Sequence, residues 1–258
     1  EYYVLLNSDV EVSDNWVQPI IKLMDNDESI AACQPKIKSY SNKSLFDYAG
    51  ASGGFIDRFG YPFCRGRIFD TLEEDKTQYD DVIEVFWATG ACLFLRAKAY
   101  HEVGGLDIDF FAHMEEIDLC WRLKNRGYKV MCEPKSTVYH VGGGTLQKSN
   151  PNKTYLNFRN SLFTLVKNHP QKGLISVLII RLLLDALAGI KFLISFEFSN
   201  IWAILKAHFS FYRSYSMTYK KRQNQDYSSL PHVYQASIVF QYYLKGKKNF
   251  NDLARLWS

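Results

Sequence analysis

The sequence has few of the residues that would indicate a disulfide scaffold, a cysteine-bound metal or a nucleic-acid partner. The five cysteines are odd in number and lack the spacing of metal ligands; they are Cys33, Cys64, Cys92, Cys120 and Cys132. We therefore expect buried, reduced thiols. The formal net charge of +4 over 258 residues is too small to indicate nucleic-acid binding, although it is compatible with a surface that meets anionic lipid.

The chain also lacks a long uninterrupted apolar run. Its most apolar stretch, residues 174–196, contains Arg181, Asp185 and Lys191, whereas a membrane-spanning helix needs about 20 nearly uncharged residues. We expect this stretch to lie in the membrane interface without crossing it. The alternative is a buried helix in a helical subdomain. Aromatic residues at 209–212 precede a basic run at 220–222, a pattern typical of a lipid headgroup layer.

The order of apolar runs and helical patterns along the sequence favours an α/β fold. An apolar run at residues 2–6, a helical pattern at 16–24 and a second apolar run at 29–37 predict a strand–helix–strand unit. We expect the first run to be a buried strand of parallel type. Further strands are predicted at residues 82–87, 91–95, 128–132 and 137–141, and helices at 97–103 and 114–125.

Two further segments complete the predicted organisation. Residues 39–67, rich in glycine, serine and aromatic residues, are expected to form a loop region over a site. Only helices are expected after residue 150. We therefore predict one domain at residues 1–150 and a helical, membrane-associated region at 151–258.

An acidic cluster opens the helix predicted at 114–125. Glu115 and Glu116 are adjacent, and Asp118 follows. Neighbouring carboxylates raise one another's pKa, and a general base needs a pKa near neutrality. Two structural alternatives stay open, because a helix N-terminus favours acidic residues and because Asp118 and Arg122 have the spacing of a helical ion pair.

Asp9 and His140 are candidate metal ligands. Asp9 follows the first strand, within Asn7-Ser8-Asp9, and ligands of open α/β sheets bind beyond the carboxyl ends of strands. A carboxylate there suits Mg²⁺ or Mn²⁺ shared with a phosphate-bearing substrate, although a turn aspartate is the alternative. His140 precedes the glycines at 142–144. Neutral histidine is a good metal ligand, and glycines let a backbone approach a ligand, although a lone histidine is more often structural.

Taken together, these motifs resemble family 2 glycosyltransferases of the GT-A fold, in particular bacterial rhamnosyltransferase-like members. The resemblance covers about the first 150 residues, and residues 155–160 resemble the helix that follows the catalytic domain in bacterial members. The matching segments are Leu5–Val12, Trp87–Ala91, Val103–Asp107 with Phe110 and Phe111, Glu115–Arg122 and Tyr139–Gly144.

The resemblance implies a mixed α/β sheet with helices on both faces, followed by an all-helical, membrane-associated region. It also implies that the nucleotide-binding strands would precede residue 1, so we expect an N-terminally truncated chain. The expected reaction is an inverting transfer of a sugar from a nucleotide-diphosphate sugar to an acceptor hydroxyl. The acceptor would be a cell-surface polysaccharide or a lipid-linked glycan, and the cofactor Mg²⁺ or Mn²⁺.

The resemblance assigns roles to individual residues. Asp9 and His140 correspond to metal or diphosphate ligands. Glu116 corresponds to the base, with Glu115 as its alternative and Asp118 in a supporting role. The predicted substrate-binding residues are Asn7, Trp87, Thr89, Gly90 and Arg122.

The expected partners are the donor, the acceptor and a membrane surface, with no nucleic acid. The expected location is the cytoplasmic face of a bacterial inner membrane. Two other functions remain open from the sequence, a non-catalytic sugar-binding relative and a metal-dependent phosphohydrolase.

Overall fold

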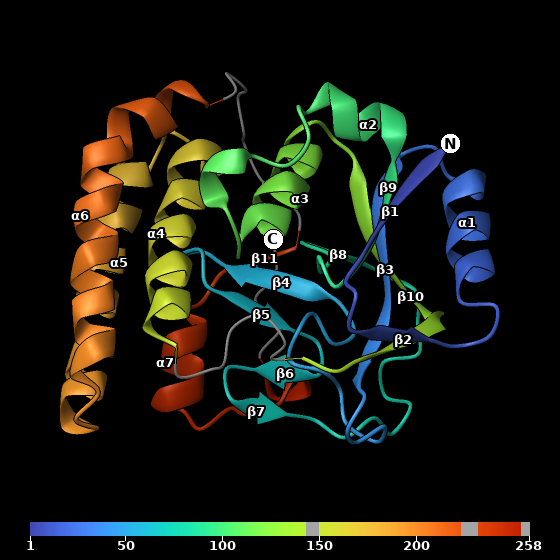
Figure 1. Cartoon of the computed structure of the whole chain (residues 1–258), viewed down its shortest axis with the longest axis horizontal. Coiled ribbons are helices and arrows are strands. Elements are labelled where there is room, and N and C mark those ends of the chain that lie inside the picture. Colours follow the sequence, from blue (N-terminus) through green and yellow to red (C-terminus); the bar gives the residue numbers. More distant parts are fainter. Residues whose placement is uncertain (143–149, 223–231, 254–258) are drawn as a thin grey trace. The chain divides into compact units, whose positions relative to one another are not determined.

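The computed structural model describes residues 1–142, 150–222 and 232–253 (Figure 1). The chain divides into two compact units, which we describe separately. Unit 1 comprises Glu1–Gly105, Leu119–Gly144 and Ser229–Ser258, and unit 2 comprises Leu106–Asp118 and Thr145–Ser228. The bounds of these compact units differ from those of the domains predicted at 1–150 and 151–258. Gly143 and Gly144 of the predicted glycine run lie outside the described residues.

Unit 1 is built on a mixed sheet, as predicted. The strand order is β1 (Tyr2–Leu6), β9 (Cys92–Arg96), β3 (Ile30–Ser39), β10 (Lys129–His140) and β2 (Val10–Val12), and β8 (Ile83–Val85) also pairs with β10. The β3–β10 pair is parallel and the other pairs are antiparallel. The sequence predicted two strands, at 128–132 and 137–141, but the structure has the single strand β10. Its pairing register with β3 shifts between Glu133 and Thr137.

The first strand differs from its prediction. β1 lies at one end of the strand order and pairs antiparallel with β9, and the side chains of Val4 and Leu6 are exposed. The expectation of a buried strand of parallel type was wrong, because an apolar run alone does not tell a central strand from an edge strand. β1 and β3 both run antiparallel to β9, so they share a direction, as the predicted strand–helix–strand unit requires.

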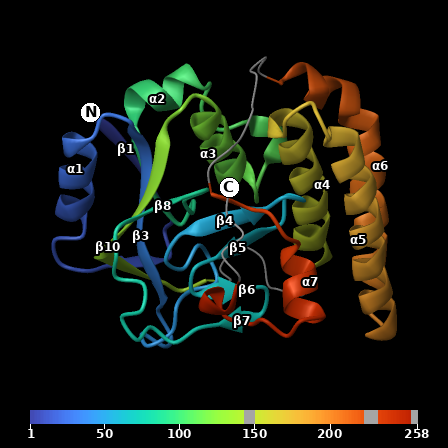
Figure 2. The ribbon, with the colours of Figure 1, turned by 180° about the vertical axis from the view of Figure 1, so that it is seen from behind.

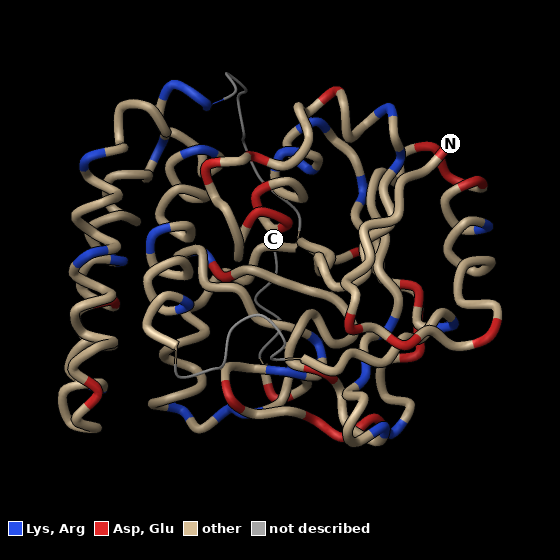
Figure 3. Tube along the Cα trace, in the orientation of Figure 1, with Lys and Arg blue, Asp and Glu red and all other residues tan. Residues whose placement is uncertain are grey.

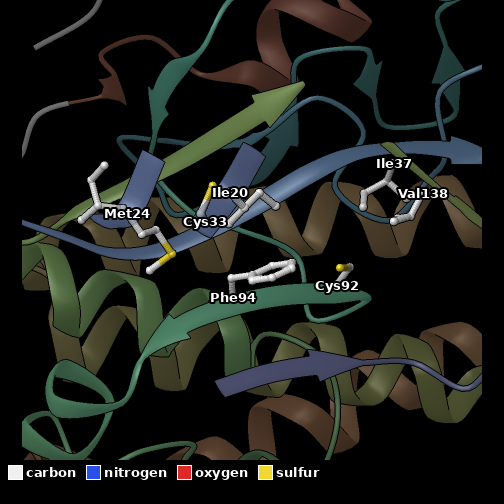
Figure 4. Packing of buried hydrophobic residues seen from close by; sticks show 8 residues of the cluster. Ile20, Met24, Cys33, Ile37, Cys92, Phe94 and Val138 are labelled. Atoms are coloured by element: carbon white, nitrogen blue, oxygen red, sulfur yellow. The ribbon is translucent and has the colours of Figure 1, made fainter. Parts of the chain in front are cut away.

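The helix of that unit, α1 (Val17–Asn26), packs against β3 and β10. Its Ile20 and Met24 are fully buried and belong to one core cluster with Cys33, Phe94 and Val138 of the sheet (Figure 4). Burial of such side chains stabilises a fold by roughly 1.5–3 kcal/mol each. All five cysteines are buried and free, which confirms the prediction of buried thiols.

A second, smaller sheet in unit 1 corrects two predictions. Its strand order is β11 (Val233–Tyr234), β4 (Gly54–Asp57), β5 (Pro62–Cys64), β6 (Arg67–Ile68) and β7 (Thr71–Leu72). Residues 39–67 therefore contain strands where only a loop was expected. The prediction of an all-helical C-terminal region was also wrong, since β11 pairs with β4 ahead of α7 (Ile238–Tyr243). These strands have two to four residues, which is too short for an apolar run or an alternating pattern to be recognised in the sequence.

Two further helices complete unit 1. α2 (Ala97–Glu102) matches the helix predicted at 97–103, and it is followed by Gly104 and Gly105, both with positive φ, as is common after a helix. α3 (Glu115–Asn125) begins in unit 2 and continues into unit 1 after Asp118. Its unit 1 part packs by Trp121 against Phe86, with ring centroids 5.2 Å apart.

Unit 2 is helical in its described part. α4 (Pro151–Asn168), α5 (Leu174–Ile194) and α6 (Phe198–Lys220) pack against one another and lie side by side in both views (Figures 1 and 2). A short 3-10 helix, Ile108–Phe110, precedes α3. Among the described residues, we find no helix whose length and apolar character would let it cross a membrane.

Candidate active site

In unit 1 the fold brings Asp9 and His140 together. Asp9 stands between β1 and β2, and His140 is the last residue of β10, which pairs with β2. The backbone N–H of Val141 donates to the carbonyl of Asp9 over 3.0 Å. This pairing leaves His140 Nε2 at 3.4 Å from the Asp9 carboxylate.

A second carboxylate, that of Asp47, orients the same imidazole. Its Oδ1 lies 2.9 Å from His140 Nδ1 and also accepts from the N–H of Ala49 at 2.8 Å. Burial lowers the pKa of His140, but the hydrogen bond to Asp47 and the charges of Asp47 and Asp9 raise it above its usual value overall. A carboxylate can only accept a hydrogen bond, so Nδ1 donates to Asp47 and the ring is held with Nε2 facing Asp9. A metal-binding histidine is typically oriented in this way by a carboxylate on its other nitrogen.

The two atoms fit a hard divalent ion. Ligands about 2.1–2.2 Å from one ion and at right angles stand about 3 Å apart, close to the 3.4 Å between His140 Nε2 and the Asp9 oxygen. Within the described ranges, no group of three or more histidine, cysteine, aspartate or glutamate side chains is placed to hold an ion. The described residues thus offer Asp9 and His140 as two candidate ligands.

Of the predicted substrate-binding residues, Thr89 and Gly90 share one turn of unit 1, and Asn7 lies beside that turn. The backbone N–H of Asn7 donates to the carbonyl of Ala91 at 3.0 Å, so Asn7 lies beside the 89–91 segment. Thr89 is buried, with its N–H bonded to the Gln34 side chain at 2.9 Å and its hydroxyl accepting from Ala91 at 3.2 Å. Gly90 between them is partly exposed. The turn is thus rigidly held next to the end of β1.

Trp87 and Arg122, the other two predicted substrate-binding residues, are buried and bonded to backbone carbonyls. Trp87 Nε1 donates to Phe55 at 2.8 Å, and a Cβ on Gly54 would meet the indole ring at 2.2 Å. Arg122 donates to Val103 at 2.6 Å and to Gly105 at 2.8 Å, which satisfies carbonyls at the end of α2. These contacts give both side chains a structural role.

In unit 2 the acidic pair opens α3, as predicted. Glu115 and Glu116 are partly buried, and one oxygen of each, Oε2, is buried with no hydrogen-bond partner among the residues that the structure describes. Burial raises the pKa of Glu115. Burial, and then the neighbouring charge of Glu115, raise the pKa of Glu116 to about 8. A carboxylate with this pKa is suited to accept a proton near neutral pH.

Asp118, predicted to support the base, is fully buried in an ion pair. Lys167 of α4 lies 2.8 Å from one of its oxygens, and Asn168 donates to the other at 2.7 Å. Lys167 also pairs with Asp107 at 2.7 Å. These bonds fasten the first turn of α3 to α4.

The segment just before Glu115 has an unusual backbone. Phe111, His113 and Met114 have φ between 64° and 72°, a left-handed region that costs bulky residues roughly 1–3 kcal/mol each. Asn160 of α4 holds this segment through its amide, which donates to the carbonyls of Phe110, Ala112 and His113 at 2.7–2.9 Å.

Arg159 donates to the carbonyls of Asp109 and Phe110 at 3.1 and 3.0 Å. The strain and the bonds from Arg159 and Asn160 together fix where α3 begins.

Sequence reasoning did not assign roles to Asp47, Asn160, Lys167 or Asn168. Asn160, Thr164, Lys167 and Asn168 are buried polar residues at helical spacing on α4, and that polar stripe was a readable signal. Asp47 had none, because its partner His140 lies far along the chain.

Comparison with known proteins gives relatives of one kind. The chain is 39% identical over 56 residues to the N-acetylglucosaminyl-diphospho-decaprenol L-rhamnosyltransferase of Mycobacterium tuberculosis, a match that covers 22% of this chain and 18% of that protein. It is 24% identical over 140 residues to the rhamnosyltransferase WbbL of Escherichia coli, covering 54% of this chain and 52% of WbbL. No family model matches the chain.

A crystal structure of GalNAc-T7 with UDP, GalNAc and Mn²⁺ is a structural neighbour with a TM-score of 0.44. The two chains are 16% identical. The match covers 64% of this chain and 31% of the GalNAc-T7 chain. The similarity to rhamnosyltransferases confirms the resemblance read from the motifs. The chain spans about half of WbbL and less than a fifth of the mycobacterial protein.

Proposed function

We propose that this chain acts in a glycosyltransferase that moves a sugar from a nucleotide-diphosphate sugar to an acceptor hydroxyl. The observation that carries the proposal is the approach of Asp9 to His140, 3.4 Å apart although they come from distant parts of the sequence. The relatives, both rhamnosyltransferases, support the same activity. The acceptor would be a growing cell-surface polysaccharide or a lipid-linked glycan, and the GT-A fold belongs to this proposal.

Asp9 and His140 would hold Mg²⁺ or Mn²⁺, with Asp47 fixing the ring of His140. When bound, the ion supplies positive charge to the diphosphate of the donor as that group leaves. The chain's own contribution would be to hold the imidazole of His140, through Asp47, with Nε2 on the side of Asp9.

Glu116 would take the proton from the acceptor hydroxyl. Its pKa of about 8 makes it a stronger base than an ordinary carboxylate, and its Oε2 has no competing hydrogen bond among the described residues. The acceptor oxygen would then bond to the anomeric carbon while the bond from that carbon to the diphosphate breaks, so one displacement inverts the configuration. Glu115 raises the pKa of Glu116, and Asp118 with Lys167 anchors the helix turn.

The test is a transfer assay with the full-length protein. A panel of nucleotide-diphosphate sugars that includes a rhamnose donor is incubated with Mg²⁺ or Mn²⁺, with and without a lipid-linked glycan acceptor. The proposal predicts acceptor-dependent release of nucleotide diphosphate and an elongated glycan of inverted anomeric configuration. Phosphate release without glycan elongation would instead indicate a phosphohydrolase. Binding of sugar without turnover would indicate a non-catalytic relative.

A further inference from the structure

In unit 2, helix α5 has its polar residues inside and its apolar residues outside. Arg181 and Asp185 are almost completely buried, whereas apolar side chains on the opposite side of the helix are exposed. The exposed set recurs at helical spacing and consists of Ile175, Ile179, Leu183, Leu187, Ile190 and Ile194. A helix surrounded by water has the reverse pattern, with its apolar stripe toward the core.

The buried side of α5 is held by polar contacts. Arg181 donates to the Ser161 hydroxyl of α4 at 2.8 Å and lies 3.5 Å from Asp185. His208 of α6 lies 3.1 Å from the other oxygen of Asp185. Ionisable residues that pair inside a helix bundle, beneath an apolar exterior, are typical of proteins whose exterior meets lipid.

Helix α6, which packs against α5, also exposes aromatic and basic side chains. Phe198, Trp202, Leu205, Phe209 and Tyr212 are 56–69% exposed. Lys206, Arg213 and Lys220 are exposed too, and they follow one another at intervals of seven residues, so they form a column beside the aromatic stripe.

The charges of α5 and α6 select an anionic partner. Between residues 171 and 222 the only exposed carboxylate is Glu197, because Asp185 is buried. The exposed cations Lys172, Lys206, Arg213 and Lys220 outnumber the exposed acids of these helices. Figure 3 shows the same excess of basic over acidic positions along α5 and α6.

We propose that this exposed face of α5 and α6 lies on an anionic phospholipid surface. The aliphatic and aromatic side chains would enter the boundary between headgroups and acyl chains, and the basic column of α6 would contact lipid phosphates. A second copy of the chain fits this face less well, since symmetric pairing would bring the same cations together. None of the residues proposed for catalysis belongs to α5 or α6, so vesicle binding and sugar transfer can fail independently.

The test is co-sedimentation of the full-length protein with vesicles. Vesicles of phosphatidylcholine alone are compared with vesicles that also contain phosphatidylglycerol, at low and at high salt. We expect binding to the anionic vesicles that is weakened by salt, and little binding to phosphatidylcholine alone.

Two variants, each with a matched control, locate the binding face. Leu183→Ser/Leu187→Ser/Ile190→Ser and Arg213→Glu/Lys220→Glu should each weaken binding about 10-fold or more. Leu244→Ser, an exposed leucine of unit 1, and Lys22→Glu/Lys98→Glu should bind like wild type.

Tryptophan fluorescence tests the same contact without disturbing the helix. Anionic vesicles should shift the emission of wild type to the blue, and Trp202→Phe should lose most of that shift while still sedimenting. Failure of the wild-type protein to bind any vesicle would overturn the proposal, as would equal binding by all variants. A dimer that the triple variant converts to monomer, with vesicle binding unchanged, would show that the face binds a second copy instead.

Discussion

Nδ1 of His140 lies 2.9 Å from the carboxylate of Asp47, so the imidazole has a fixed tautomer and a fixed orientation. Such an oriented ring binds a metal more tightly than a free one, because its second nitrogen is already aimed. Asp47 is buried with His140 and also caps the turn at Ala49. It is therefore the residue through which the proposed metal site can be probed without removing a ligand.

We predict that Asp47→Asn weakens Mn²⁺ binding about 10–100-fold. The amide can still accept from Ala49, so the fold should persist, but the negative charge that orients His140 is lost. Isothermal titration calorimetry with Mn²⁺ measures the effect, with Asp14→Asn, an exposed aspartate, as the control. Unchanged affinity in Asp47→Asn would place the metal elsewhere.

The pKa of Glu116 also predicts an effect on stability. A carboxyl whose pKa rises from about 4.5 to about 8 on folding stabilises the folded state fully below its unfolded pKa, and this contribution is lost as pH rises through 8. Glu116→Gln removes the titration. The variant should match wild type near pH 4.5 and exceed it in unfolding free energy by on the order of 2 kcal/mol above about pH 9.

Urea unfolding of both proteins across this pH range gives the difference directly. Lys98→Gln, a change at an exposed residue, serves as the control for altered net charge. A constant difference between wild type and Glu116→Gln at all pH values would mean that Glu116 is not buried in its neutral form.

The strained segment before α3 depends on Asn160. Its amide makes three hydrogen bonds to the carbonyls of Phe110, Ala112 and His113, and the methyl group of alanine cannot replace them. Asn160→Ala should lower the unfolding free energy by about 2–4 kcal/mol. Hydrogen exchange at residues 111–116 should accelerate more than exchange in α5. Asn152→Ala, at an exposed asparagine of the same helix, should leave both quantities near wild type. Equal acceleration in both segments would argue against a local role.

The ion pair of Lys167 with Asp118 predicts a strong coupling. Lys167→Met leaves a fully buried carboxylate without its cation and should cost about 3–5 kcal/mol. Asp118→Asn alone removes the charge but keeps a polar group near Asn168, so it should cost less. In a double-mutant cycle the two changes together should cost clearly less than their sum. Additive costs would mean that the pair does not stabilise the fold.

The sequence predicted the parts of this structure that rest on local signals. The helix predicted at 97–103, the acidic start of α3 and the helical spacing of α1 each depend on neighbouring residues, and each is present. The edge position of β1, which pairs with β9, and the pairing of β11 with β4 depend on distant segments, which no local pattern encodes.

The candidate site shows the same division. Asp9 and His140 were found as separate motifs, and the resemblance to glycosyltransferases linked them. Asp47 and Asn160 act through the folded chain: Asp47 bonds the histidine at the end of β10, and Asn160 bonds carbonyls of the segment before α3. The polar spacing of α4 pointed to Asn160 as a buried residue, but only the structure reveals the partners of both side chains.

The most direct test of the proposed function compares Glu116→Gln with Glu115→Gln in the sugar-transfer assay of the full-length protein. We predict that Glu116→Gln lowers kcat by about 10²–10⁴-fold while Mn²⁺ affinity stays at the wild-type value. Glu115→Gln should have the smaller effect and should lower the pH at which the rate reaches its plateau, because it removes the charge that raises the pKa of Glu116. Persistent transfer by Glu116→Gln, with loss of transfer in Glu115→Gln, would contradict the assignment of the base.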